Sequence, residues 1–286
     1  MVATQQYQFK VVPEWARLPD GWKFGDVVGV ATDSADRVYA FHRGSPPLLV
    51  FAPDGELIES WGEGRFVDPH SIYIDAQDRV YLVDRGAHAI YRFGPGWELQ
   101  LTLGVPGVAA GKQSGAPFNL PACVAVALSG DIFVADGYGN SRVHKYSPEG
   151  RLVRSWGAHG SGPGEFDLPH GIWVDAQQRV WVTEKQGHRL QRFTLDGEHI
   201  DTWTGFSKPN AVWVGRDGVS YFAEQNHRVS ILSPDGTLLN RWGEENTEQP
   251  GQFIAPHGLW VDSHGDLYVA EVLQGKRLQK FVRVHP

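Results

Sequence analysis

Apolar and polar positions alternate along most of the chain, in short runs separated by turn residues. One such run, Pro-His-Gly-Ile-Trp-Val at 169–174, leads through Asp-Ala-Gln-Gln-Arg into a second run at 180–183. Alternation with period two and many β-branched and aromatic residues are typical of strands. Asp-Gly steps such as Asp54-Gly55 and Asp196-Gly197 mark the tight turns between runs. The pattern therefore predicts an all-β chain of short antiparallel strands.

This pair of runs recurs six times. Three copies begin with Pro-His and are closely alike, at 69–84, 169–184 and 256–271, and weaker copies occupy 27–42, 121–136 and 209–224. Each copy is followed by a third apolar run, and in five copies a turn and a fourth strand come next. A four-stranded antiparallel unit of roughly 40–50 residues has the length of a propeller blade. We therefore expect residues 1–286 to form one six-bladed β-propeller domain.

The sixth repeat ends at Phe281-Val282-Arg283-Val284 and has only three strands. Residues 7–12, within the lead-in of residues 1–26, have a strand-like pattern and are expected to supply the missing outer strand. Such pairing would close the ring and remove an open sheet edge. A solenoid of the same strands is the alternative, but it needs capping segments that the sequence does not show.

Charge and composition narrow the class of partner. The 26 Lys and Arg against 33 Asp and Glu give a net charge of −7, which disfavours nucleic acid and anionic membrane surfaces as partners. A lone cysteine, Cys123, allows no intrachain disulfide, and neither a secretory signal nor a membrane span is recognisable. We therefore expect a cytoplasmic location; the sequence does not indicate an oligomeric state.

Histidine occupies the first slot of alternate repeats. That slot holds, in order, Val28, His70, Ala122, His170, Asn210 and His257. Equivalent positions of a propeller share radius and height, so the three imidazoles would converge about 120° apart on the axis. Three neutral imidazoles leave an open fourth position, which is typical of catalytic zinc. The alternative is that each histidine only bonds a neighbouring carbonyl, but this would not follow alternate blades.

Two further sets of equivalent positions follow the second strand. Five repeats place an acid fourteen residues after the slot, at Asp84, Asp136, Glu184, Glu224 and Glu271. Because Arg142, Arg189, Arg228 and Arg277 begin the next strand, we interpret these acids as structural ion pairs rather than a cation site. The loops just beyond the acids carry Arg43, Arg85, Tyr138 and Lys185. Cations beside a three-histidine centre suit an anionic substrate, since arginine can fork onto a carboxylate.

These motifs resemble the NHL-repeat propellers and, within them, the peptidyl-α-hydroxyglycine α-amidating lyases. The motif Asn140-Ser141-Arg142-Val143 is typical of NHL repeats in general. The lyase resemblance covers nearly the whole chain and is carried by FHRG at 41–44, LPHGIWVD at 168–175, VADGYGNSRVHKYSPEGRLVRSWG at 134–157 and APHG at 255–258. The resemblance implies a catalytic zinc on His70, His170 and His257. It also implies active-site roles for Tyr138 and Arg43.

Some positions depart from the family pattern. Glu184-Lys185 stands where the family has Asp-Arg. The lysine ammonium is a point charge, whereas the arginine that it replaces could bind a carboxylate through two hydrogen bonds. Gly258 stands where the family has the aspartate of a structural calcium site, which leaves the carbonyls of Val30 and Ile72 as weak ligands. The family's disulfide cysteines are absent, and Gly139 follows the tyrosine. We therefore expect zinc but no required calcium.

The expected activity is that of a zinc-dependent carbon–nitrogen lyase. Its substrate would be an N,O-hemiaminal, small or peptide-derived and anionic, such as an α-hydroxyglycine amide that collapses to an amide and glyoxylate. Zinc would polarise or deprotonate the hydroxyl, and Tyr138 would transfer a proton with its pKa lowered by Arg43. Lys185 or Arg85 would orient the anionic group. The alternatives are a metal-dependent lactonase or amidohydrolase on the same centre, and a non-catalytic interaction scaffold, which would not require converging histidines.

Overall fold

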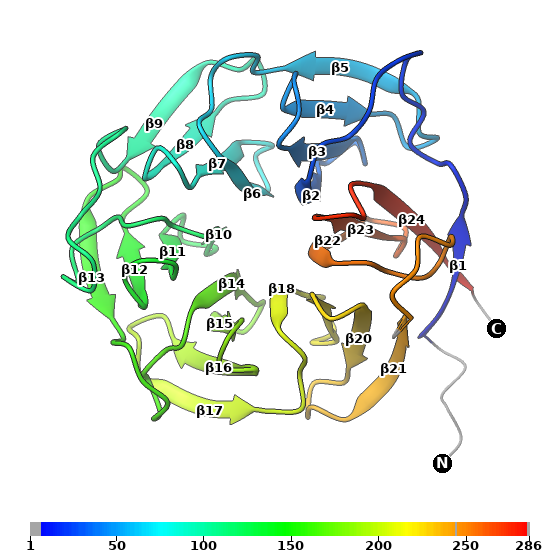
Figure 1. The fold of residues 1–286 in the computed structure, drawn as a ribbon. Coiled ribbons are helices and arrows are strands. Elements are labelled where there is room, and N and C mark those ends of the chain that lie inside the picture. The colour runs from blue at the N-terminus through cyan, green and yellow to red at the C-terminus, as the bar shows by residue number, and fades with distance from the viewer. Residues whose placement is uncertain (1–6, 244, 285–286) are drawn as a thin grey trace.

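Six four-stranded antiparallel sheets surround a central axis in the computed structural model, which describes residues 7–243 and 245–284 (Figure 1). The first strand of each repeat lies next to the axis and the last strand lies at the rim. The six-bladed propeller that the repeats predict is therefore confirmed. Within the described residues, no helix has the length and apolar character needed to cross a membrane.

The blades follow the chain in order, and each is named here by its number. Blades 1 to 3 contain β2 (Val27–Thr32), β3 (Val38–His42), β4 (Leu48–Phe51) and β5 (Leu57–Trp61); β6 (Pro69–Ile74), β7 (Val80–Asp84), β8 (Ala89–Phe93) and β9 (Leu99–Leu103); and β10 (Cys123–Val126), β11 (Ile132–Asp136), β12 (Arg142–Tyr146) and β13 (Leu152–Trp156). Blades 4 to 6 contain β14 (Pro169–Val174), β15 (Arg179–Glu184), β16 (Arg189–Thr194) and β17 (His199–Trp203); β18 (Pro209–Val214), β19 (Ser220–Glu224), β20 (Arg228–Leu232) and β21 (Leu238–Gly243); and β22 (Pro256–Val261), β23 (Leu267–Glu271), β24 (Leu278–Val284) and the N-terminal β1 (Gln8–Val12).

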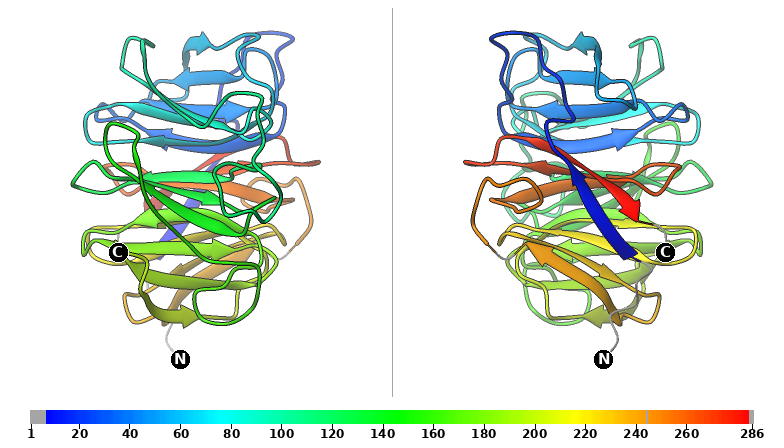
Figure 2. Two further views of the ribbon diagram at one scale, coloured as in Figure 1. Left: turned by 90° about the vertical axis from the view of Figure 1, so that its left-hand side faces the viewer. Right: turned by 90° about the vertical axis from the view of Figure 1, so that its right-hand side faces the viewer.

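The N-terminal strand closes the ring. β1 pairs antiparallel with β24, from Gln8 opposite Val284 to Val12 opposite Lys280. Figure 2 shows the two strands side by side at the edge of the molecule. Phe9 also stacks on Trp242 of blade 5, with ring centroids 5.8 Å apart. The first and last segments of the chain are thus joined in one sheet, as the three-stranded sixth repeat predicts.

Deleting residues 1–12 should lower the free energy of unfolding by roughly 3 kcal/mol or more, because Phe9, Val11 and Val12 lose buried contacts worth about 1 kcal/mol each. The unpaired edge of β24 should also favour association between chains. Urea titration of the deleted and full-length proteins checks this. Removing residues 1–6 alone is the matched control, because it leaves β1 complete. Equal stability of the full-length and 1–12-deleted proteins would contradict closure by this strand.

The acids that end the second strands are structural in the way that the sequence predicts. Glu184 pairs with Arg189 at 2.6 Å, and the equivalent pairs Glu224–Arg228 and Glu271–Arg277 measure 2.8 and 2.6 Å. Blade 3 differs from this prediction. There Asp136 accepts a hydrogen bond from the Asn140 side chain at 2.8 Å and lies 3.2 Å from Nε2 of His144 on β12, so these side chains bond the buried carboxylate instead of an arginine.

Candidate metal centre

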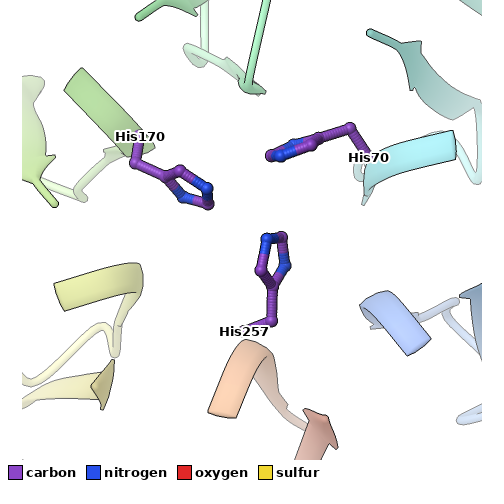
Figure 3. Close-up of side chains that lie close together, drawn as sticks. All are labelled: His70, His170 and His257. Carbon is purple, nitrogen blue, oxygen red and sulfur yellow. The ribbon is translucent and has the colours of Figure 1, made fainter. Parts of the chain in front are cut away.

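The three predicted histidines meet on the propeller axis (Figure 3). His70, His170 and His257 lie near the starts of β6, β14 and β22, and their side chains point toward one another. Their ring centroids are 4.9 to 5.0 Å apart, and one nitrogen of each ring lies within 4.8 Å of the others. All three residues are buried, with exposed fractions of 0, 2 and 6%.

A local irregularity of the inner strands lies at each histidine. The pairing register of β6 with β7 shifts between Pro69 and Ser71, and the corresponding shift in β22 lies between Pro256 and Gly258. A β-bulge of this kind re-aims a side chain and is common beside functional sites. The inner strand can therefore direct both His70 and the later residue Tyr73 to the axis, although their spacing of three would put them on opposite faces of a regular strand.

Each imidazole is held by the blade that follows it. Nδ1 of His70 lies 2.7 Å from the carbonyl oxygen of Ala122, and the same distance joins His170 to Asn210 and His257 to Val28. These acceptors occupy the histidine slot of the next blade. A carbonyl oxygen only accepts, so Nδ1 carries the proton and Nε2 keeps its lone pair. The carbonyl contact that we considered as an alternative to metal binding is therefore present, and it orients the ring for a ligand at Nε2.

The electrostatic environment keeps the imidazoles neutral. Burial, the other two imidazoles and Arg85 hold the pKa of His70 well below its ordinary value. Burial, together with Lys185 and the two arginines, lowers the pKa of His257 to about 3. Three neutral imidazole nitrogens at this spacing fit the set of ligand atoms that Zn²⁺ prefers.

Tyr138 lies directly beside this centre. Its hydroxyl oxygen is 3.1 Å from Nε2 of His70 and 3.0 Å from Nε2 of His170. Burial raises the pKa of Tyr138, and the positive charges of Arg85 and Arg43 oppose this only in part. Arg43 therefore acts to lower this pKa, as the sequence predicts, but burial is the larger effect and the net direction is a rise. The Arg85 guanidinium lies over the ring, 4.7 Å from its centroid. The phenol is thus protonated at neutral pH.

The irregular spacer between blades 2 and 3 positions the Tyr138 loop. The amide of Gln113 donates to the carbonyl of Gly139 at 2.9 Å, and the amide of Gly139 donates to the carbonyl of Asn119 at 3.0 Å. Asn140 is fully buried and also joins this segment, with its side chain bonded to Gly115 and Ala116. The sequence signals this contact only through the unusual length of the spacer.

Arg43 and Arg85 are braced by acids that the sequence analysis did not single out. Arg43 contacts Asp26 at 3.2 Å and Asp68 at 2.7 Å, and Nε of Arg85 donates to the same Asp68 at 2.7 Å. Asp68 lies two residues before His70, so one carboxylate links both guanidinium groups to the strand that carries this histidine. The two arginines therefore have part of their hydrogen-bonding capacity already occupied by the protein.

Lys185 reaches the centre from blade 4. Its amide donates to the carbonyl of Leu168 at 3.0 Å, and Arg43 and Arg85 make the equivalent bonds to Asp26 and Asp68. The loops that carry Arg43, Arg85 and Lys185 are thus anchored in the same way in their three blades. Burial, together with nearby Lys208, Arg85 and Arg43, lowers the pKa of Lys185 to about 8. Within residues 7–243 and 245–284, its ammonium has no acidic ion-pair partner, so it is available to a ligand.

Aromatic rings fill the axis beyond the histidines. A cavity of about 40 Å³ adjoins the three imidazoles, and Tyr73, Trp173 and Trp260 contact one another across the axis with centroids 5.2 to 5.7 Å apart. A Cβ atom at Gly258 would lie 2.9 Å from Cα of Gly29, so a carboxylate side chain does not fit there without a shift. That no structural calcium is required remains a prediction.

Comparison with known proteins identifies the class. Residues 124–212 match a protein-family model described as a 6-bladed beta-propeller. NHL repeat-containing protein 3 of Mus musculus is 31% identical, over 94% of this chain and 84% of that protein. The chain therefore belongs to the NHL-repeat six-bladed β-propellers, and the resemblance seen in the sequence is confirmed.

Its relatives within that class include amidating lyases. Peptidyl-alpha-hydroxyglycine alpha-amidating lyase 1 of Drosophila melanogaster is 28% identical, over 91% of this chain and 57% of that protein. Among solved structures, a gluconolactonase of Xanthomonas campestris superimposes with a TM-score of 0.70 at 19% identity, over 92% of this chain and 87% of that one. This second likeness establishes the shared fold alone.

Proposed function

We propose that the protein is a zinc-dependent lyase that cleaves an N,O-hemiaminal, such as an α-hydroxyglycine amide, to an amide and an aldehyde such as glyoxylate. The observation that carries the proposal is the convergence of three neutral Nε2 atoms with the Tyr138 hydroxyl 3.0 to 3.1 Å from two of them. The similarity to the Drosophila lyase supports the reaction class.

His70, His170 and His257 would hold the metal. When bound there, Zn²⁺ supplies Lewis-acid polarisation of a substrate hydroxyl. The imidazoles contribute by staying neutral and oriented, since each Nδ1–H is committed to a carbonyl 2.7 Å away. The aromatic rings of Tyr73, Trp173 and Trp260 fill the axis behind them, so substrate approaches from the loops that carry Tyr138 and Lys185.

Tyr138 is the proton-transfer group in this proposal. The carbinol must lose its O–H proton while the C–N bond breaks, and the leaving amide nitrogen must gain a proton. Burial raises the pKa of Tyr138, so the phenol has a proton to donate to that nitrogen. The phenolate then regains the proton that the carbinol hydroxyl releases, and the enzyme returns to its starting state. The overall reaction transfers one proton from oxygen to nitrogen and forms a C=O bond.

Lys185 is the cation that binds the anionic end of the substrate. Asp26 and Asp68 already engage Arg43 and Arg85, whereas the Lys185 ammonium lacks an acidic partner among the described residues. Arg85 keeps a second role, because its guanidinium lies over the Tyr138 ring and favours the phenolate.

The affinity for an anionic substrate should fall as pH rises through about 8. Lys185 is charged below its pKa of about 8 and neutral above it, so the attraction is present at lower pH and lost at higher pH. KM measured across this range for a carboxylate-bearing hemiaminal and its neutral amide checks the prediction. The rise in KM should be absent for the neutral analogue and in Lys185→Met. A KM for the anionic substrate that stays level through pH 8 would contradict the role of Lys185.

Incubation with N-benzoyl-α-hydroxyglycine tests the activity itself. The proposal predicts benzamide and glyoxylate in equal amounts, with turnover lost after chelation and recovered with zinc. The competing hydrolase would instead open a simple lactone and leave the hemiaminal intact.

A further inference from the structure

The channel has a second mouth at the end opposite the histidines, which we call the far mouth. It is lined by residues three positions after the histidine slot, where four blades carry large aromatic side chains: Tyr73, Trp173, Trp213 and Trp260. The other two blades carry Ala31 and Ala125 at this position. A cavity of about 640 Å³ lies against the four rings.

The aromatic side chains form the floor of this cavity. Trp173 is central, with its ring centroid 5.6 Å from that of Tyr73, 5.9 Å from Trp213 and 5.2 Å from Trp260. All four rings are half-buried, so each keeps accessible surface. Leu128, in the turn of blade 3, is 84% exposed and extends the apolar wall. Cavities of roughly 300–1,000 Å³ with mainly apolar and aromatic walls are typical of small-molecule sites.

The charged side chains that line the far mouth differ in exposure: two acids are buried and one arginine is exposed. The lining acids Asp175 and Asp262 are buried and already bonded, Asp175 to Trp181 Nε1 at 2.7 Å and Asp262 to the Tyr268 hydroxyl at 3.1 Å. Arg216, on the turn that follows β18, is exposed and lines the same cavity. Among the described residues its guanidinium has no ion-pair partner. The accessible charge beside the tryptophans is therefore positive.

We propose that the far mouth is a second ligand site, which takes a planar aromatic molecule bearing one carboxylate or comparable anionic group. The ring system stacks edge-to-face or offset on Trp173 and Trp213, and the anion accepts the two-pronged hydrogen bond of Arg216. This site is separated from the histidines by the rings that fill the axis, so it stands independently of the proposed lyase activity.

Binding of three naphthalene probes tests the site: 2-naphthoate, 2-naphthylmethanol and 2-naphthylmethylammonium, each titrated into the full chain by ligand-observed NMR. The carboxylate should bind most tightly. Arg216→Ala should weaken the carboxylate roughly tenfold and leave the alcohol unchanged, since a charge-assisted hydrogen bond is lost. Trp213→Ala should weaken all three probes. Arg65→Ala is the matched control, because Arg65 is likewise exposed and lies over a tryptophan, 5.0 Å from the Trp61 ring, but does not line this cavity.

Lys185→Met distinguishes the two ends of the channel. The proposal predicts an unchanged Kd for 2-naphthoate in this variant, because Lys185 lies at the histidine end. Equal affinities of the three probes, or an Arg216→Ala protein that binds the carboxylate normally, would overturn the proposal. So would a loss of 2-naphthoate binding in Lys185→Met with Arg216→Ala unaffected, since the ligand would then occupy the metal centre.

Discussion

Tyr138→Phe should reduce kcat for hemiaminal cleavage by about a hundredfold or more while leaving the metal content unchanged. The substitution removes only the hydroxyl that lies 3.0 to 3.1 Å from two imidazole nitrogens, and the ring can stay beneath Arg85. Proton delivery to the leaving nitrogen would then depend on water. Because the contribution is made in the transition state, KM should change far less than kcat.

Tyr91→Phe is the matched control for this prediction. Tyr91 lies on β8 in blade 2, half-buried among aromatic residues away from the histidines, so its hydroxyl should not affect turnover. Steady-state kinetics and elemental analysis of the two variants make the comparison. A Tyr138→Phe protein with wild-type kcat would remove the tyrosine from the proposed mechanism.

His170→Ala should abolish stoichiometric zinc binding and lower turnover by more than a hundredfold. Loss of a residue that merely orients a metal ligand commonly costs roughly 10- to 100-fold in affinity or activity, and loss of a ligand itself should cost more. The prediction follows from geometry, since two imidazoles cannot complete the three-nitrogen set that the structure assembles on the axis. Metal analysis after extensive dialysis measures the effect directly.

His188→Ala provides a control in the same blade. His188 accepts a hydrogen bond from the amide of Lys208 at 3.2 Å and takes no part in the three-histidine cluster. We expect about one zinc per chain in this variant and in the unchanged protein. Undiminished zinc in His170→Ala, or in the variant that lacks all three histidines, would mean that the triad serves only to join blades.

The fold could be predicted from the sequence because its signals are local. The apolar runs at 48–51, 89–93 and 142–146 coincide with β4, β8 and β12, since alternation and turn residues determine both ends of each strand. The alternate-blade histidines were likewise visible, because propeller symmetry converts sequence spacing into position on the axis.

Other features of the site depend on burial and on contacts between distant segments. Nothing in the sequence indicates that burial outweighs two arginines and raises the pKa of Tyr138. The bracing of Arg43 and Arg85 by Asp68 depends on two blades meeting at one carboxylate. Simple alternation of apolar and polar residues also does not predict the bulge at Pro69–Ser71. This bulge affects which later side chains of β6 face the axis together with His70.

The most direct test of the account is product analysis with the metal-loaded protein and an α-hydroxyglycine amide, before and after chelation. We expect equimolar amide and glyoxylate, no products from the chelated protein, and recovery when about one equivalent of zinc is restored. A protein that binds zinc at His70, His170 and His257 but leaves the hemiaminal intact would contradict the proposed reaction.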